Sequence, residues 1–159
     1  MPENLNTTDW DSTRDEPGFS WKRRMIARQL GGKDLGASLY ELPVGERLFP
    51  YHLHHGNEEL LIVLEGEPTL RTPDGETELR AGDVELFPTG PAGAHQVKNN
   101  SDGTVRLLMI STMTSPEVVE YPDSEKVGAL AWPPGGSRDD AFVAFFPKAS
   151  EVGYFDGET

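Results

Sequence analysis

The chain of 159 residues contains no cysteine. A disulfide framework and a metal site built on thiolates are therefore both excluded. Long apolar segments are missing as well, because runs such as 60–64 extend over only a few residues. A bilayer-spanning helix needs about 20 apolar residues, so no membrane span is expected. The first residues lack the basic and apolar pattern of a secretory signal, and we therefore expect a cytoplasmic protein.

Basic residues are scarce. The chain has 14 lysines and arginines against 27 aspartates and glutamates, which gives a formal net charge of -13. Such a surface repels the phosphate backbone of nucleic acids and anionic lipid headgroups. We therefore expect neither nucleic acid nor membrane partners, and a small molecule is the expected ligand or substrate.

No segment shows the pattern of an amphipathic helix of ordinary length. Instead, 17 glycines and 13 prolines separate short β-compatible runs, and turns such as Asp74-Gly75 favour hairpins. This pattern predicts an all-β fold, either a sandwich or a barrel. Strands are predicted near 22–29, 37–42, 49–54, 60–65, 68–71, 77–80, 83–87, 95–99, 105–113 and 118–120. Core positions are predicted at Leu60, Ile62, Leu64, Leu86, Leu107 and Met109.

Composition divides the chain into three parts. Residues 1–20 are polar and acidic and are predicted to be a disordered segment or an arm that crosses to a neighbour. Residues 21–121 carry the predicted strands. Residues 122–159 are loop-rich, notably at 132–136, and then return to the apolar stretch 142–146. That stretch is too apolar for a free tail, so we expect this extension to pack on the barrel or on a dimer partner.

All four histidines fall in two short segments, 51–59 and 93–95. Residues two apart on a strand point to the same face, so His52 and His54 would project side by side. A turn at Gly56-Asn57 can bring Glu59 against this pair, and fold closure can add His95. Three imidazoles and one carboxylate suit one divalent transition metal ion such as Zn, Fe, Mn, Ni or Co.

The spacing of these residues resembles the two sequence motifs of the cupin superfamily. Residues 45–66 read Gly, six residues, His-x-His, four residues, Glu, six residues, Gly. Residues 82–99 read Gly, five residues, Pro-x-Gly, four residues, His, three residues, Asn. The first spacer is one residue longer than in the family pattern, and the gap before the last histidine is four residues rather than two. Both departures fall in predicted loops, and all four ligand types are present.

The resemblance implies a double-stranded β-helix, the jelly-roll barrel of a small single-domain cupin. It also implies the metal ligands His52, His54, Glu59 and His95. Glu59 is preferred to its neighbour Glu58 because Glu59 stands six residues before the closing glycine of the motif. His55 has the opposite facing from His54, which favours a surface position or a place behind the ligands.

Small cupins resembling this one include dioxygenases, isomerases and decarboxylases, and the fold does not select among them. A metal-dependent enzyme that acts on a small polar molecule is the first hypothesis. A non-catalytic module that binds or senses a small molecule is the alternative, as is a cupin that binds no metal. The resemblance also implies a homodimer formed through sheet edges. Arg47 is a candidate for binding a substrate carboxylate; other candidate pocket residues are Tyr40, Phe49, Tyr51, Gln96 and Met109.

Overall fold

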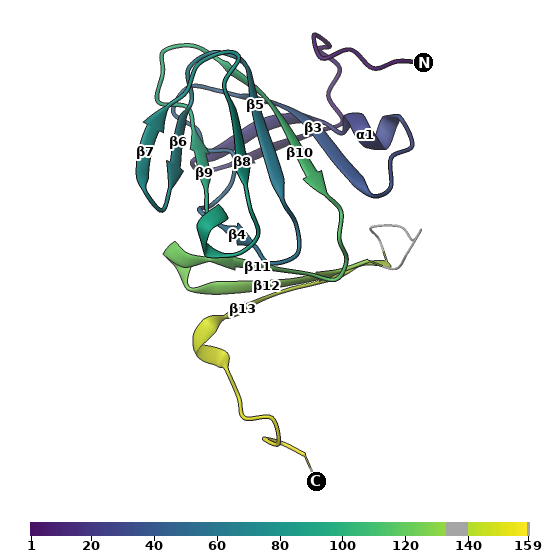
Figure 1. Ribbon diagram of the computed structural model, residues 1–159, viewed down its shortest axis with the longest axis vertical. Helices are drawn as coiled ribbons and strands as arrows, with labels where there is room; N and C mark the ends of the chain where they lie inside the picture. The colour runs from purple at the N-terminus through teal and green to yellow at the C-terminus, as the bar shows by residue number, and fades with distance from the viewer. Residues whose placement is uncertain (133–139, 159) are drawn as a thin grey trace.

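The computed structural model describes residues 1–132 and 140–158, and within them the strands form three antiparallel sheets (Figure 1). The strand orders are β1-β2-β3-β10-β5-β8, β13-β12-β11-β4 and β7-β6-β9. The strands are β1 (Ser12–Glu16), β2 (Phe19–Arg24), β3 (Leu35–Leu42), β4 (Leu53–His54), β5 (Glu59–Glu65), β6 (Thr69–Thr72), β7 (Gly75–Glu78), β8 (Val84–Phe87), β9 (Gln96–Lys98), β10 (Val105–Thr112), β11 (Glu117–Tyr121), β12 (Lys126–Ala131) and β13 (Phe142–Pro147). The helical segments are α1 (Ile26–Gln29), η1 (Pro91–Gly93), η2 (Pro122–Ser124) and η4 (Lys148–Ser150). The predicted all-β jelly roll is confirmed.

The hydrophobic core lies on the inner face of the six-stranded sheet. On β5, Leu61 and Val63 are fully buried, whereas the predicted core positions Leu60, Ile62 and Leu64 are only partly buried. The prediction therefore assigned the core to the wrong face of β5. Strand alternation explains the error, because Leu61 and Val63 share the face of Glu59 and that carboxylate points into the barrel.

Other core predictions divide in the same way. Leu107 and Met109 on β10 are buried as expected, while Leu86 on β8 is 57% exposed.

Gly66, the last residue of the first motif, has a φ of +84° and lies so close to Val105 that a Cβ would overlap it. Glycine is therefore required at this turn for both its backbone conformation and its lack of a side chain.

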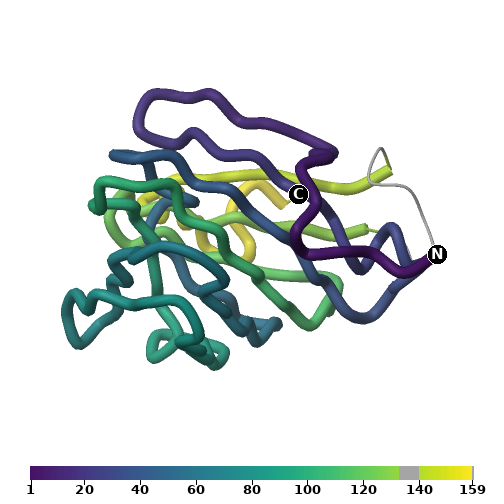
Figure 2. The backbone as a smooth tube through the Cα atoms, turned by 90° about the horizontal axis from the view of Figure 1, so that it is seen from above, coloured from purple at the N-terminus to yellow at the C-terminus, as the bar shows by residue number. Residues whose placement is uncertain are grey.

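The N-terminal segment is more ordered than its composition indicates. β1 pairs with β2 in an antiparallel hairpin from Ser12↔Arg23 to Glu16↔Phe19, and this hairpin extends the six-stranded sheet (Figure 2). The strand predicted over 22–29 ends early, and its second half forms the short helix α1.

The C-terminal extension contributes two strands that were not predicted. β12 pairs with β11, and β13 pairs with β12 along its whole length. After η4 the chain projects away from the body of the molecule (Figure 1). Most of the loop predicted at 132–136 lies outside the described residues. Among the residues described, no helix has the length and hydropathy required to cross a membrane.

Candidate metal centre

Strand pairing places three of the predicted ligands close together. His54 lies on β4, and His52 forms a bridge with His95 in which each backbone N–H donates to the other residue's carbonyl, at 3.1 and 2.8 Å. The two motifs are thus joined by backbone hydrogen bonds at their histidines. Side-chain convergence follows, with the rings of His52 and His95 centred 4.6 Å apart and those of His52 and His54 5.0 Å apart.

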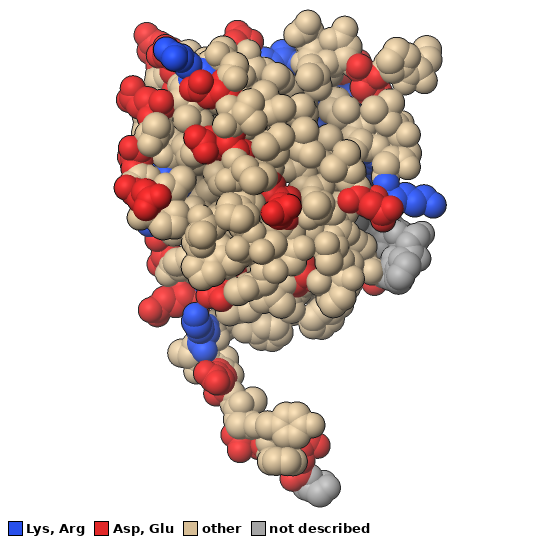
Figure 3. Space-filling model, viewed as in Figure 1, with Lys and Arg blue, Asp and Glu red and all other residues tan. Residues whose placement is uncertain are grey.

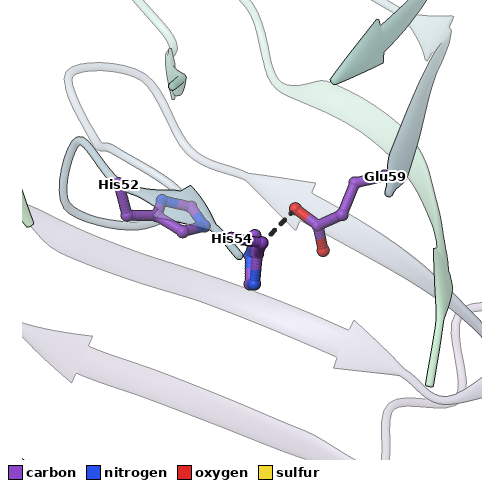
Figure 4. Close-up of side chains that lie close together, drawn as sticks. All are labelled: His52, His54 and Glu59. Atoms are coloured by element: carbon purple, nitrogen blue, oxygen red, sulfur yellow. Dashed lines mark ion pairs between the residues drawn. The ribbon is translucent and has the colours of Figure 1, made fainter. Parts of the chain in front are cut away.

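Glu59 completes the cluster from the start of β5. Its Oε2 atom lies 3.3 Å from Nε2 of His54 and 3.3 Å from Nε2 of His95. Ligand atoms of His52, His54 and Glu59 all lie within 4.8 Å of one another, and Figure 4 shows Glu59 pointing toward His54. All four predicted ligands therefore meet at one place in the structure, although their binding of a metal stays a proposal.

The backbone orients two of the imidazoles. Nδ1 of His52 lies 2.8 Å from the carbonyl oxygen of Pro50, and Nδ1 of His95 lies 2.9 Å from that of Gly93. A proton on each Nδ1 makes these contacts hydrogen bonds and leaves the Nε2 lone pairs directed to the centre. Phe87 stacks on the ring of His95, with centroids 3.8 Å apart and planes at 9°. The rings are thus fixed before any ligand binds.

His54 supplies the observation that fits a metal ion. Both of its ring nitrogens are buried, and neither forms a hydrogen bond within the described part of the chain. Buried polar atoms without partners are rare because each costs about 1–3 kcal/mol. A divalent ion held by His52, His54, Glu59 and His95 satisfies Nε2 of His54, and the donor set of three nitrogens and one oxygen suits a transition metal.

The electrostatics of the cluster agree with this fit. Burial lowers the pKa of His52 to about 3, and the neighbouring His95 and His54 add to the shift. Burial alone would lower the pKa of His54, but its contacts with Glu59 and Glu117 raise it above the usual value. Burial would raise the pKa of Glu59, yet the two histidines beside it hold that pKa well below its usual range. A neutral His52 and an ionised Glu59 are the protonation states that metal ligation requires.

The two neighbouring residues that were set aside as ligands point elsewhere. His55 faces outward and pairs with Glu120, with Nε2 2.7 Å from Oε1. Glu58 is exposed, and its backbone N–H donates to the hydroxyl of Thr112. The outward facing predicted for His55 by alternation and the preference for Glu59 over Glu58 from the motif spacing both agree with the structure.

Sequence reasoning missed Glu117, a carboxylate on β11 that is only 3% exposed. Its Oε1 accepts hydrogen bonds from the backbone N–H groups of His55 and Gly56, at 3.2 and 3.1 Å. Its Oε2 has no hydrogen-bond partner among the described residues and lies 3.8 Å from Nδ1 of His54. Glu117 thus fixes the turn after His54 and presents a charge to the back of that imidazole.

The cluster borders a cavity of about 170 Å³. Its walls include His54 and Glu59, the hydroxyl residues Ser38, Ser111 and Thr112, and the cation Arg23. The remaining lining residues are Gly36, Tyr40, Asn57, Met109, Met113, Glu117, Val119, Leu130 and Trp132.

The candidate pocket residues from the sequence divide between two environments. Tyr40 and Met109 line this cavity, whereas Phe49 and Gln96 lie beside the buried faces of His52 and His95. Tyr51 packs beneath Arg71, whose guanidinium is 3.9 Å from the ring centre. The other candidate, Arg47, is exposed and lies over the ring of Phe19 at 5.4 Å, outside the cavity lining. No sequence motif marked Arg23, Leu130 or Trp132, because they enter the site from strands outside both motifs.

Comparison with known proteins places this site in a family. No curated protein matches the chain at the level of sequence. A candidate sugar phosphate isomerase from Acidithiobacillus ferrooxidans is 25% identical, with a TM-score of 0.75 over 88% of this chain and 86% of that one. A sugar phosphate isomerase of the cupin superfamily from Silicibacter pomeroyi is 23% identical, with a TM-score of 0.77 over 96% of both chains. A polyketide cyclase from Streptomyces resistomycificus is 24% identical, with a TM-score of 0.57 over 74% of this chain and 84% of that one.

The second and third of these likenesses show the fold alone. Residues 38–111 match the family described as the cupin domain, and this range contains all four residues of the cluster. With the jelly-roll barrel and both motifs in place, residues 38–111 of the protein are a cupin domain.

Proposed function

We propose that the protein is a metal-dependent isomerase that acts on a small polar molecule of the sugar type. The observation that carries the proposal is the cluster of His52, His54, Glu59 and His95 at the wall of a cavity lined in part by hydroxyl groups. Its volume of about 170 Å³ is below the roughly 300–1,000 Å³ of pockets for drug-sized ligands, so the substrate is a small molecule. The relative from Acidithiobacillus ferrooxidans supports an isomerase rather than the other reaction types of the family.

The lining of the cavity suits a molecule rich in hydroxyl groups. Ser38, Ser111 and Thr112 bring hydroxyls to its wall, and Asn57 brings an amide. The Ser38 hydroxyl accepts from Arg23 and can still donate, and the Ser111 hydroxyl donates to the backbone and can still accept, which suits a polyol. Thr112 and Asn57 are hydrogen-bonded to each other and to the backbone, so they hold the wall in place and orient a substrate against the cluster.

A divalent ion bound to the cluster would act as a Lewis acid on the carbonyl oxygen of the substrate. In the isomerisation itself, a base takes the proton from the hydroxyl-bearing carbon next to the carbonyl, the electron pair of that C–H bond forms a carbon–carbon double bond, and the π electrons of the carbonyl move to its oxygen. The base then returns the proton to the former carbonyl carbon, while the hydroxyl proton passes to the former carbonyl oxygen and the hydroxyl-bearing carbon becomes the new carbonyl. The reaction needs no oxidant or reductant. The contribution of this chain is the orientation of His54 by Glu117 and of His52 and His95 by backbone carbonyls.

The proposal is tested by loading tag-free protein with Zn, Mn, Fe, Ni or Co and supplying aldose and ketose phosphates in deuterated water. An isomerase incorporates deuterium at carbon, which NMR detects even where the equilibrium favours the starting compound. Incorporation should depend on the metal and disappear in His54→Ala. Oxygen consumption or carbon dioxide release without incorporation would instead identify an oxygenase or a decarboxylase. Saturable binding with no turnover under any metal would favour a sensing module.

A homodimer is part of the proposal. β13 is the edge of its sheet, and its outer backbone groups pair with no strand among the described residues. Its side chains Phe142, Val143, Phe145 and Phe146 are about half exposed. An unpaired apolar edge is a liability that a second copy would cover.

The surface charge bears on other partners. Carboxylates outnumber cations on the face shown in Figure 3, and such a surface repels the phosphates of nucleic acids, which supports the proposal that the protein does not bind them. The cytoplasmic location stays a prediction.

A further inference from the structure

Arg23 points into the barrel from β2. The burial pattern of this strand places Trp21 in the core and Lys22 in solvent, so alternation turns Arg23 to the inner face. Arg23 then lines the cavity that the metal cluster borders, and it is the one lysine or arginine among the described lining residues.

A buried hydroxyl fixes the orientation of this side chain. Nε and Nη2 of Arg23 both donate to Oγ of Ser38, at 3.0 and 2.9 Å, and Ser38 is only 6% exposed. The guanidinium also lies 5.6 Å from the ring centre of Tyr40. Nη1 donates no hydrogen bond within the described part of the chain, so one side of the planar fork is held and the other is available.

The neighbouring cations on β2 are paired and Arg23 is not. Lys22 lies 2.7 Å from Glu41, and Arg24 lies 2.8 Å from Glu3. Within the residues described, Arg23 has no carboxylate partner, although the chain carries 27 acidic residues. An unneutralised positive charge inside a cavity is unusual, because partial burial removes water from the guanidinium. The binding of an anion beside it is therefore more favourable than at an exposed arginine.

Strand register gives the separation of Arg23 from the cluster. Along the sheet, β2 is followed by β3, β10 and β5, and Glu59 on β5 stands opposite Ser111 on β10. Through Tyr40 and Leu107, Arg23 is level with Val63 of β5, so the backbone of Glu59 lies three strand spacings, about 14 Å, across the sheet and four residues, about 13 Å, along it. The Arg23 side chain covers part of the second distance, because it reaches Ser38, two residues nearer the Glu59 end of the sheet. Both side chains extend inward toward the same cavity, so a small molecule can contact the cluster at one end and the guanidinium at the other.

We propose that Arg23, oriented by Ser38, binds the anionic group of the ligand, a phosphate or a carboxylate, at the end of the cavity away from the histidine cluster. The guanidinium fork matches two oxygens of either group with two parallel hydrogen bonds. The role of this anion as part of a substrate rests on the proposed isomerase function, but the binding of the anion does not. Arg23 then determines specificity for charged over neutral polyols.

The test compares two ligands that differ only in the charged group. Calorimetry measures the binding of glucitol 6-phosphate and of glucitol to the zinc-loaded full chain, with gluconate as the carboxylate counterpart. The variants are Arg23→Gln, which removes the charge, and Arg23→Lys, which keeps it without the fork. Arg47→Gln is the matched control, because Arg47 also lacks a carboxylate partner among the described residues but lies outside the cavity lining.

Glucitol 6-phosphate should bind about 10- to 100-fold more tightly than glucitol, as expected for charge-assisted hydrogen bonds. Arg23→Gln should abolish this preference, while Arg47→Gln should retain it. Gluconate binding that is lost in Arg23→Gln would assign a carboxylate to the same place. If Arg23→Gln does not fold, Arg23→Lys decides, and it should lose the preference severalfold.

Two results would overturn the assignment of Arg23. The first is that the unaltered protein binds glucitol 6-phosphate and glucitol with equal affinity, or binds neither of them. The other is a preference for the phosphorylated polyol that survives in Arg23→Gln. A preference that depends on Arg23 in a protein with no isomerase turnover would refute the proposed reaction and leave the anion site standing.

Discussion

Substitutions of Glu117 can distinguish its role in stabilising the turn after His54 from its role beside the proposed metal site. Its Oε1 accepts the backbone N–H groups of His55 and Gly56, whereas its Oε2 faces Nδ1 of His54 at 3.8 Å. When His54 binds a metal through Nε2, Nδ1 carries a proton and requires an acceptor. A carboxylate behind a metal-bound histidine is such an acceptor, and loss of one typically lowers metal affinity by about 10- to 100-fold.

The two oxygens predict different outcomes for two substitutions. Glu117→Ala leaves the N–H of Gly56 without an acceptor, whereas the N–H of His55 keeps the carbonyl oxygen of Val118 at 2.9 Å, so the metal-free variant should lose about 1–3 kcal/mol of unfolding free energy. Glu117→Gln keeps one oxygen for these N–H groups, and its stability should stay within about 1 kcal/mol of the unaltered protein. Its amide nitrogen then opposes the proton on Nδ1 of His54, so zinc affinity should fall by about 10- to 100-fold.

Urea unfolding in EDTA measures the first effect, and competition with a zinc chelator measures the second. The reasoning is refuted if Glu117→Gln binds zinc as tightly as the unaltered protein. It is equally refuted if Glu117→Ala and Glu117→Gln unfold at the same urea concentration, because then the two backbone hydrogen bonds contribute nothing. His55→Gln is a suitable control, since this neighbour faces outward and should leave zinc affinity unchanged.

Four further substitutions test the ligands, a loop and the dimer. Elemental analysis of the unaltered protein should find about one equivalent of metal, and His54→Ala and His95→Ala should each lose it; retention of one equivalent in both would exclude this site. Gly93→Ala should lower the unfolding free energy by about 1–3 kcal/mol or more in thermal or urea melts, because a Cβ there overlaps the carbonyl of Pro88; an unchanged melt would contradict this packing. Phe145→Asp on the edge strand β13 should reduce the mass in light scattering from a dimer to the 17.5 kDa of one chain, and an unaltered protein that is already monomeric would refute the interface.

The ligand cluster could be predicted because its information is local. His52 and His54 are two apart on a strand, and Glu59 lies one turn later, so a period of two and a short loop bring them together. Only His95 needs a long-range contact, which the second motif supplied. The same period would have given the buried face of β5. Glu59 points inward, so Leu61 and Val63 had to follow it, and the prediction of Leu60, Ile62 and Leu64 conflicted with the ligand assignment.

The residues that shape the cavity carried no local signal. Arg23 stands between Lys22 and Arg24 on β2, so the sequence shows no alternation there, and its inward facing is recognised only because Trp21 is buried. Glu117 follows a proline and resembles any exposed acid in a chain with 27 of them. Only pairing with distant strands gives these side chains their surroundings, as when β11 places Val119 opposite His54. Arg47, which sits inside a motif, was the more visible arginine and lies in solvent.

The positions of these residues indicate that the family domain and the strands flanking it have different roles in the site. The four clustered residues lie within 38–111, the part that matches the cupin domain. Arg23 on β2, Glu117 on β11 and Trp132 after β12 lie outside that range and yet line the cavity. The domain therefore contains the four candidate metal ligands, whereas residues of the flanking strands contribute charge and shape to the cavity beside them. Substrate preference should consequently follow the hairpin and the C-terminal strands, and variants there should change which molecule binds while metal content stays constant.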